Sequence, residues 1–292
     1  MAIYSLDKIL STKVLRLSTG FHHLDRGFGS TMHGNIESFG MPCGRIVFAS
    51  GEPGVGKTRF GIAVIKNINA RGGKILVFQG EVPPQEFKQW TGDVTYPHRL
   101  FVSDDTKIDT IIRYIKQEVP TFVVIDSANM IDDYEKPSEI RQILDDLKAA
   151  VSDTGCVCFM IGHLTKDGKM KGNADVAHLV DVECSIIKVH TKNMRSWDGI
   201  DFVEHLRDNL NPKLFRAALK KIESYQPGLF RYNIGKNRYG KSGGFAVFHH
   251  TATGIEYLDS GALFNRINNT NSTDQSYKKP SKASSWSSWW SH

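Results

Sequence analysis

One stretch of eight residues, 51–58, limits what this chain can fold into more than any other. Its sequence, Gly-Glu-Pro-Gly-Val-Gly-Lys-Thr, fits the pattern G-x-x-x-x-G-K-[ST], in which backbone N–H groups surround a phosphate. We call it the P-loop. Glycine lets the backbone approach an anion in conformations that a Cβ atom would forbid. An apolar run at 46–49 predicts a strand before the loop, and residues 59–70 predict a helix whose N-terminus faces the anion.

This strand, loop and helix predict a nucleotide-binding site. Lys57 can reach the β- and γ-phosphates, and the hydroxyl group of Thr58 can ligate Mg²⁺. The expected nucleotide-binding residues are the consecutive positions Gly51, Glu52, Pro53, Gly54, Val55, Gly56, Lys57, Thr58 and Arg59.

The composition is that of an ordinary globular protein. The 292 residues are 40% hydrophobic, and no apolar run approaches the 18 residues of a membrane span. The N-terminus lacks the apolar segment of a signal peptide, so we expect a cytoplasmic protein. Lys and Arg number 37 against 31 Asp and Glu, and this net charge of +6 slightly favours polyanionic partners.

The cysteines predict neither a disulfide nor a structural metal site. No C-x-x-C pair is present, and two of the four alternate on an apolar strand, so buried thiols are expected. The four are Cys43, Cys156, Cys158 and Cys184.

Short apolar runs and amphipathic segments alternate along the chain. We expect these segments to form an α/β fold, with a twisted and mostly parallel sheet and helices on both faces. Strands are expected at 74–79, 100–102, 121–126, 156–163, 182–189, 229–235, 243–249 and 254–258, and helices at 82–90, 108–115 and 138–152.

Two acidic residues follow strands at the edge where parallel sheets bind ligands. Asp126 ends the strand at 121–126, and a carboxylate there can hold Mg²⁺ through water beside Thr58. Glu81 follows the strand at 74–79, and it can orient and deprotonate an attacking water molecule. Position alone leaves a solvated loop glutamate as an equal alternative for Glu81.

Residues 17–29, Leu-Ser-Thr-Gly-Phe-His-His-Leu-Asp-Arg-Gly-Phe-Gly, predict a short N-capped helix that ends in glycines. They resemble the segment S-T-G-x-x-x-L-D-x-x-x-G-G before the P-loop of RecA-superfamily ATPases, particularly the RadA/Sms and KaiC-like families. The resemblance implies a RecA-like ATPase core with ATP and Mg²⁺ as cofactors. It also implies that Glu81 is the catalytic glutamate and that His163, at the end of the strand at 156–163, senses the γ-phosphate.

Residues 162–181 carry a closer resemblance. Their sequence, Gly-His-Leu-Thr-Lys-Asp-Gly-Lys-Met-Lys-Gly-Asn-Ala-Asp-Val-Ala-His-Leu-Val-Asp, is similar without a gap to a RadA/Sms segment that faces single-stranded DNA. The resemblance implies that Lys166, Lys169 and Lys171 bind DNA, and such a loop can follow phosphates without reading bases. From the residues alone, a solvated basic loop is the alternative.

Residues 236–240, Lys-Asn-Arg-Tyr-Gly, form what we call the basic turn. They resemble the K-N-R-F-G signature of RadA/Sms and the K-Q-R-N-G of DnaB-type replicative helicases, whose Lys and Arg reach the triphosphate of the adjacent subunit. The resemblance implies catalytic roles for Lys236 and Arg238 in a homo-oligomer, either a ring, expected to be a hexamer, or a filament. A β-turn with two solvated cations is the alternative.

The expected organisation has three parts. Residues 1–15 form an N-terminal extension with a short helix, and residues 16–265 form the RecA-like domain. Within this domain, 30–44 is a glycine-rich loop, and 190–228 is a helical insert that RadA/Sms lacks. Residues 266–292 form a disordered tail, because they lack core-building aliphatic residues. Its tryptophans suggest either a docking peptide for a protein partner or stacking on single-stranded bases; they are Trp286, Trp289 and Trp290.

Together these features predict an ATP-dependent motor, a DNA-dependent ATPase or helicase, that acts on single-stranded DNA in recombination, repair or replication. RadA-like branch migration is favoured, and a compact build would suit a viral or mobile-element protein. The alternatives are a DnaB-like replicative helicase and a KaiC-like regulatory ATPase that acts on protein partners. A non-enzymatic scaffold is disfavoured because Lys57, Glu81 and Asp126 are all present.

Overall fold

The computed structural model describes residues 13–127, 137–162, 179–188, 211–213, 215–216, 220, 228–251 and 254–257. The helices in this part of the chain are α1 (His22–Phe28), α2 (Lys57–Ala70), α3 (Pro84–Thr91), α4 (Ile108–Glu118) and α5 (Pro137–Thr154), with a 3₁₀ turn at Pro97–Arg99. The strands are β1 (Arg16–Leu17), β2 (Ser30–His33), β3 (Ile36–Phe39), β4 (Met41–Pro42), β5 (Arg45–Gly51), β6 (Ile75–Gln79), β7 (Leu100–Ser103), β8 (Phe122–Asp126), β9 (Val157–Ile161), β10 (Val182–Lys188), β11 (Leu229–Asn237), β12 (Phe245–His250) and β13 (Ile255–Tyr257).

Within the described residues, nine strands form one sheet in the order β13-β12-β11-β10-β5-β9-β8-β6-β7. The strands from β10 to β7 are mutually parallel. The remaining strands, β11 to β13, add an antiparallel extension beyond β10. The prediction of a mostly parallel α/β sheet is therefore confirmed.

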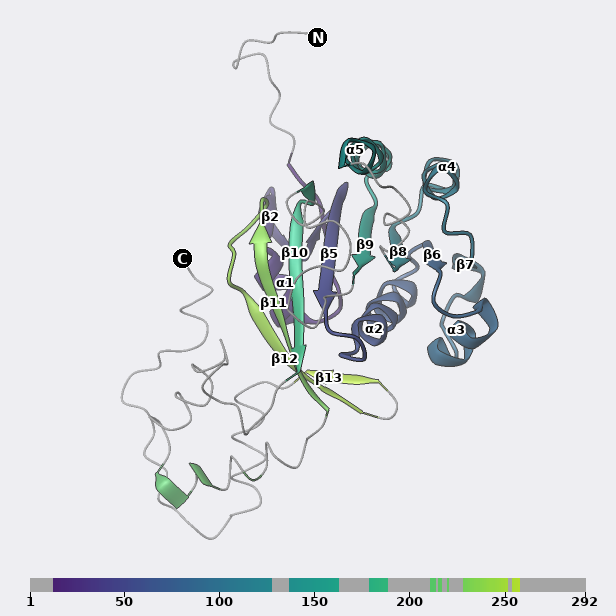
Figure 1. The fold of residues 1–292 in the computed structure, drawn as a ribbon. Coiled ribbons are helices and arrows are strands. Elements are labelled where there is room, and N and C mark those ends of the chain that lie inside the picture. The colour runs from purple at the N-terminus through teal and green to yellow at the C-terminus, as the bar shows by residue number, and fades with distance from the viewer. Residues whose placement is uncertain are drawn as a thin grey trace.

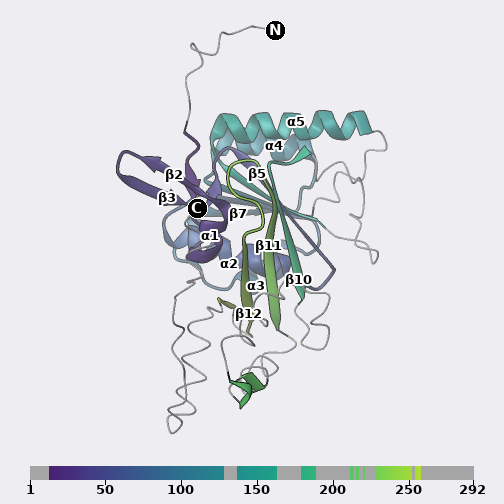
Figure 2. The same cartoon turned by 90° about the vertical axis from the view of Figure 1, so that its left-hand side faces the viewer.

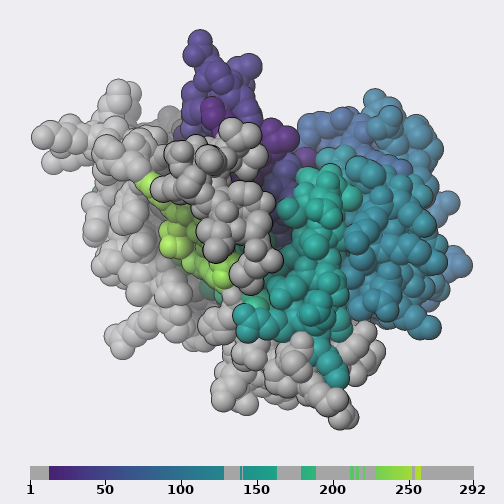
Figure 3. Space-filling model, turned by 90° about the horizontal axis from the view of Figure 1, so that it is seen from above, coloured from purple at the N-terminus to yellow at the C-terminus, as the bar shows by residue number. Residues whose placement is uncertain are grey.

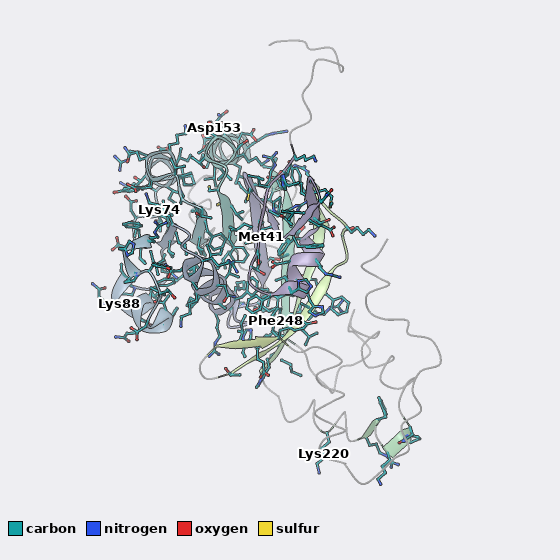
Figure 4. All side chains as sticks on the ribbon, turned by 180° about the vertical axis from the view of Figure 1, so that it is seen from behind. Met41, Lys74, Lys88, Asp153, Lys220 and Phe248 are labelled. Carbon is teal, nitrogen blue, oxygen red and sulfur yellow. The ribbon has the colours of Figure 1, made fainter. Side chains whose placement is uncertain are left out.

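Helices cover both faces of the parallel part, with α4 and α5 on one side and α2 on the other (Figure 1). The buried strands contribute side chains to two hydrophobic cores, one on each face of the sheet, because successive side chains point to opposite faces. In β5, Val47 and Ala49 join the core under α2, whereas Ile46 and Phe48 join the core under α4 and α5. Met41 and Phe248 lie among the packed side chains of the interior, while Lys88 and Asp153 lie at the surface (Figure 4).

The expectation of a loop at 30–44 is wrong in its first part. Strands β2 and β3 form an antiparallel hairpin that projects from the body of the molecule (Figures 2 and 3). The pair His33 and Ile36 closes a two-residue turn whose first residue, Gly34, has φ of 59°. Glycine at that place is typical of tight hairpin turns, because it adopts positive φ without steric cost.

The expected N-cap of α1 is also wrong. The N-cap residue is Phe21, and it makes no side-chain cap hydrogen bond. The hydroxyl groups of Ser18 and Thr19 instead donate to the buried carboxylate of Asp25, over 2.6 and 2.7 Å. These residues therefore fix the approach to α1 through a side chain of the helix instead of by capping its backbone.

Cys156, Cys158 and Cys184 are buried free thiols, as expected, and Cys43 is half-buried. Burial raises the pKa of Cys156 to about 11. None of the described helices is both long enough and apolar enough to cross a membrane. The helix expected within 1–15, most of the 190–228 insert and the whole of the 266–292 tail lie outside the described residues.

Phe159 tests the packing between β9 and α2. Its ring is 1% exposed and lies 5.8 Å from the Phe60 ring and 6.2 Å from the Phe122 ring, between centroids. We expect Phe159→Ala to lower the free energy of unfolding by about 3–5 kcal/mol, because it leaves a cavity in the core. The matched control, Phe101→Ala on edge strand β7, where the side chain is 46% exposed, should cost less than about 1 kcal/mol. Equal losses in urea unfolding would contradict this assignment of the core.

Candidate nucleotide-binding site

The P-loop joins β5 to α2 at the carboxyl end of the sheet. Gly54 and Gly56 have φ of 74° and 93°, a left-handed conformation that favours glycine. A Cβ atom on Gly54 would meet no heavy atom within 4 Å, so the loop has open space on that side. Gly56 is the N-cap of α2, and no side chain caps this helix start. The N–H groups of a helix's first turn point toward its N-terminus, so this helix start faces the loop, an arrangement that suits an anion.

Lys57 lies inside the loop, with its side chain 4% exposed. Its Nζ donates to the carbonyl oxygens of Gly51 and Glu52, over 2.7 and 2.9 Å. Burial lowers the pKa of Lys57, and the nearby carboxylates of Asp126, Glu81 and Glu52 partly offset this effect. The ammonium group is thus held by the backbone of the loop, with three carboxylates in its electrostatic surroundings.

Thr58 and Asp126 are in direct contact. Thr58 Oγ1 donates to Asp126 Oδ2 over 2.6 Å, and Asp126 is 1% exposed. Sequence analysis missed Gln79, which pairs in register with Asp126 on the neighbouring strand and donates from Nε2 to the same carboxylate over 3.4 Å. A buried polar residue at the end of an apolar strand was the signal that could have identified Gln79.

Glu81 follows β6 after a bend at Gly80, and its side chain is exposed. Two hydrogen bonds hold this bend: the Gly80 N–H donates to the Asp126 carbonyl over 2.7 Å, and the Glu81 N–H donates to Gln79 Oε1 over 2.9 Å. The backbone of Glu81 is therefore tied to the strand ends that carry Gln79 and Asp126, while its carboxylate faces solvent.

His250, at the end of β12, packs directly against the P-loop. A Cβ atom on Gly56 would lie 2.2 Å from His250 Cε1, so only glycine fits beside this ring. The imidazole stacks on Phe230 at 3.9 Å between centroids, and its Nε2 lies 3.2 Å from the Tyr232 hydroxyl group. Burial, followed by the nearby charge of Arg59, lowers the pKa of His250 to about 4, so the ring is neutral near pH 7.

Arg59 makes a second contact between α2 and the end of β12. Its guanidinium group donates to the carbonyl oxygen of Thr251. His250 and Thr251 lie far from the P-loop in sequence and carry no motif, so sequence analysis could not place them here.

The basic turn lies at the opposite end of the sheet from the P-loop. In β10, Ile186 pairs with Gly51, and Glu183 pairs with Lys236. At about 3.3 Å per residue these register positions are about 10 Å apart, and the two loops leave the sheet in opposite directions. Figure 1 shows β5 running toward α2, whereas β11 runs the other way, toward β2.

Two carboxylate-bearing residues border the basic turn. The Arg238 N–H donates to the Asp181 carbonyl over 3.2 Å, and Arg238 Nη1 lies 3.7 Å from Asp181 Oδ1. Burial, followed by the charge of Arg238, lowers the pKa of Lys236, and nearby Glu183 and Asp181 act in the opposite sense. The two cations of the turn therefore lie together.

The residues at the P-loop suit a nucleotide with Mg²⁺. Mg²⁺ prefers hard oxygen ligands, and the Thr58 hydroxyl and Asp126 carboxylate provide two at one point. The structure thus brings together Gly51–Arg59, Asp126 and Glu81, and within this chain it separates Lys236 and Arg238 from them. His163, Lys166, Lys169 and Lys171 lie outside the described residues.

Comparison with known proteins finds a matching family model and several relatives that share one name. A family model described as an AAA domain matches residues 35–169. DNA repair protein RadA of Pseudomonas aeruginosa is 28% identical over 184 residues, which are 61% of this chain and 38% of that protein. RadA of Escherichia coli is 27% identical over 192 residues, 63% of this chain and 39% of that protein. RadA of Aquifex aeolicus is 23% identical over 256 residues, 85% of this chain and 48% of that protein.

The chain spans less than half the length of these curated relatives. The family model nevertheless covers the P-loop and the parallel strands β5 to β9. The chain therefore carries a RecA-like P-loop ATPase core that resembles the DNA repair protein RadA.

Proposed function

We propose that this chain binds ATP with Mg²⁺ and hydrolyses it as a DNA-dependent motor on single-stranded DNA, with RadA-like branch migration as its activity in recombination or repair. The observation that supports hydrolysis is the grouping of Lys57, Thr58 with Asp126, and Glu81 at the carboxyl ends of β5, β8 and β6. The names of the relatives, DNA repair proteins, support the choice of DNA as the partner.

A bound Mg²⁺–ATP supplies the reactive γ-phosphoryl group and the metal ion that neutralises its charge. Lys57 gives its ammonium donors to the phosphate oxygens in place of the loop carbonyls that hold it here. Thr58 and Asp126 hold the metal side of the site. The exposed carboxylate of Glu81 orients a water molecule and accepts its proton. Gln79 keeps Glu81 and Asp126 in a fixed relation, because it hydrogen-bonds to both.

Lys236 and Arg238 act in this proposal on the nucleotide of a neighbouring copy. Their position at the far end of the sheet supports this, since they extend away from the P-loop of their own chain. Cations at the developing charge on the phosphates stabilise the transition state, so hydrolysis depends on assembly into a ring or filament.

Glu81→Gln tests the water-activating role. We expect nucleotide binding to persist while the rate of hydrolysis falls by about 10²-fold or more, because the amide cannot accept the proton. Glu86→Gln, on the exposed face of α3, is the matched control and should hydrolyse ATP at the normal rate. Phosphate release and binding of a fluorescent ATP analogue measure the two quantities. Normal turnover by Glu81→Gln would remove Glu81 from the mechanism.

The DNA partner is tested by the salt dependence of binding. Replacing Lys166, Lys169 and Lys171 by Ala should weaken single-strand binding and flatten the slope of log K against log salt, because fewer counterions are released. DNA stimulation of the ATPase should fall, while the rate without DNA stays unchanged. A triple variant at Lys88, Lys107 and Lys116, exposed on and next to α3 and α4, removes the same charge and should change neither. A wild-type ATPase that DNA does not stimulate would favour a regulatory ATPase that acts on proteins.

The role in trans is tested by mixing two inactive variants. Arg238→Ala has an intact P-loop and Lys57→Ala has an intact basic turn, so each alone should hydrolyse poorly. Where a Lys57→Ala subunit supplies its turn to an Arg238→Ala subunit, a complete site forms, and part of the activity should return. Subunit exchange is followed by fluorescence energy transfer between labelled chains. Exchange without recovered activity would show that the basic turn does not act in trans.

A further inference from the structure

Arg16, in the two-residue strand β1, holds the basic turn in place. Its Nη2 donates to the carbonyl oxygen of Tyr239, within the turn. The same nitrogen donates over 3.3 Å to the carbonyl oxygen of Ser30, at the start of β2. Its Nη1 donates to the carbonyl of Phe28, at the end of α1, over 3.1 Å. One guanidinium group therefore joins the basic turn to the N-terminal segment, although Arg16 and Tyr239 are 223 residues apart in sequence.

The basic turn has further contacts on the same side. The Asn237 side chain donates to the Phe28 carbonyl over 3.0 Å and accepts from the Tyr239 N–H over 3.0 Å. A Cβ atom on Gly240 would lie 2.5 Å from the Phe28 carbonyl oxygen, so this close approach requires glycine. Arg45 lies over the Tyr239 ring, 4.7 Å from its centroid. The turn that carries Lys236 and Arg238 is thus fitted against the end of α1.

Arginine has the geometry that this place requires. Besides these three carbonyl groups, Arg16 donates from Nη1 to the Gly40 carbonyl over 3.4 Å and from Nε to Thr31 Oγ1 over 3.1 Å. A planar guanidinium group with five donors can serve several acceptors at once, whereas a lysine ammonium is a single point of charge. Arg16 is half-buried, and its hydrogen bonds go to one hydroxyl group and to backbone carbonyl groups, so its cation serves backbone positions.

We propose that Arg16 is a positioning residue for the reaction in the neighbouring subunit: by fixing the basic turn, it fixes where Lys236 and Arg238 meet that subunit's nucleotide. This rests on the proposed function of the basic turn in trans. A displacement of about 1 Å in a catalytic group can lower a rate by about 10²-fold. The P-loop lies at the other end of the sheet, so loss of Arg16 should leave nucleotide binding in its own chain unchanged.

The first measurement compares Arg16→Ala with wild type and with a matched control. We expect hydrolysis at least about tenfold slower, with the dissociation constant of an ATP analogue within twofold of wild type. The control is Arg71→Ala, which removes another guanidinium tie to the N-terminal segment, at the Ser18 carbonyl, without touching the basic turn. Arg71→Ala should hydrolyse ATP normally. Near-normal hydrolysis by Arg16→Ala would overturn the proposal.

The second measurement separates positioning from general damage to the fold. Mixed with Lys57→Ala, Arg16→Ala should recover activity as Arg238→Ala does, because its own P-loop is intact and its partner supplies a fixed turn. Mixed with Arg238→Ala, it should recover none, since both lack a working turn. If Arg16→Ala does not fold, Arg16→Lys, which keeps the charge and loses the forked geometry, is used in the same mixtures.

The two proposals fail differently. If Arg238→Ala with Lys57→Ala recovers activity and the Arg16 variant with Lys57→Ala does not, the defect lies in the subunit that carries it, and the role of Arg16 is overturned while the trans role of the turn stands. If neither mixture recovers activity although subunits exchange, the trans role itself fails, and the role of Arg16 fails with it.

Discussion

The hydrogen bond from Thr58 to Asp126 closes the P-loop onto the sheet, because it joins the first turn of α2 to the last residue of β8. Two further residues of the candidate site, Gln79 and Glu81, are positioned by contacts with Asp126 or its neighbours. Gln79 reaches the same carboxylate from β6, and the Gly80 N–H bonds the backbone of Asp126, which sets where Glu81 begins. The order β5-β9-β8-β6 permits this, since parallel strands bring their carboxyl ends to one edge.

The reversal of direction between β10 and β11 places the basic turn at the end of the sheet opposite the P-loop. Parallel strands alone would bring every strand end to the P-loop edge, and Lys236 and Arg238 would then lie near their own nucleotide. Because β11 is antiparallel, these cations leave at the opposite edge, beside Asp181, β1 and the end of α1. In the proposed function, the P-loop and the basic turn are thus two half-sites that one chain cannot bring together, which suits head-to-tail assembly.

Much of this arrangement was predictable from sequence, because local patterns carry it. Apolar runs predicted the strands, and the glycines with Lys57 and Thr58 predicted the loop. The hairpin of β2 and β3 was also present as a local signal, Gly34 and Asn35 between two alternating segments, which sequence analysis treated as a loop. His250 and Arg16 were not predictable, since each acts through backbone or ring contacts with residues distant in the chain. Such contacts produce no recognisable spacing of residues in the sequence.

The fit of His250 against Gly56 has a mechanical consequence. The imidazole occupies the space beside the P-loop, so the loop backbone cannot move toward β12 without pushing that strand. Strand β12 is joined to β11 by a ladder from Leu229 with His249 to Asn233 with Phe245. Beyond that ladder, β11 continues to Lys236 and the basic turn. A displacement of the P-loop toward β12 would therefore also displace the end of the β11–β12 pair that lies beside it. The other end of β11 carries the cations proposed to act on the nucleotide of the next subunit.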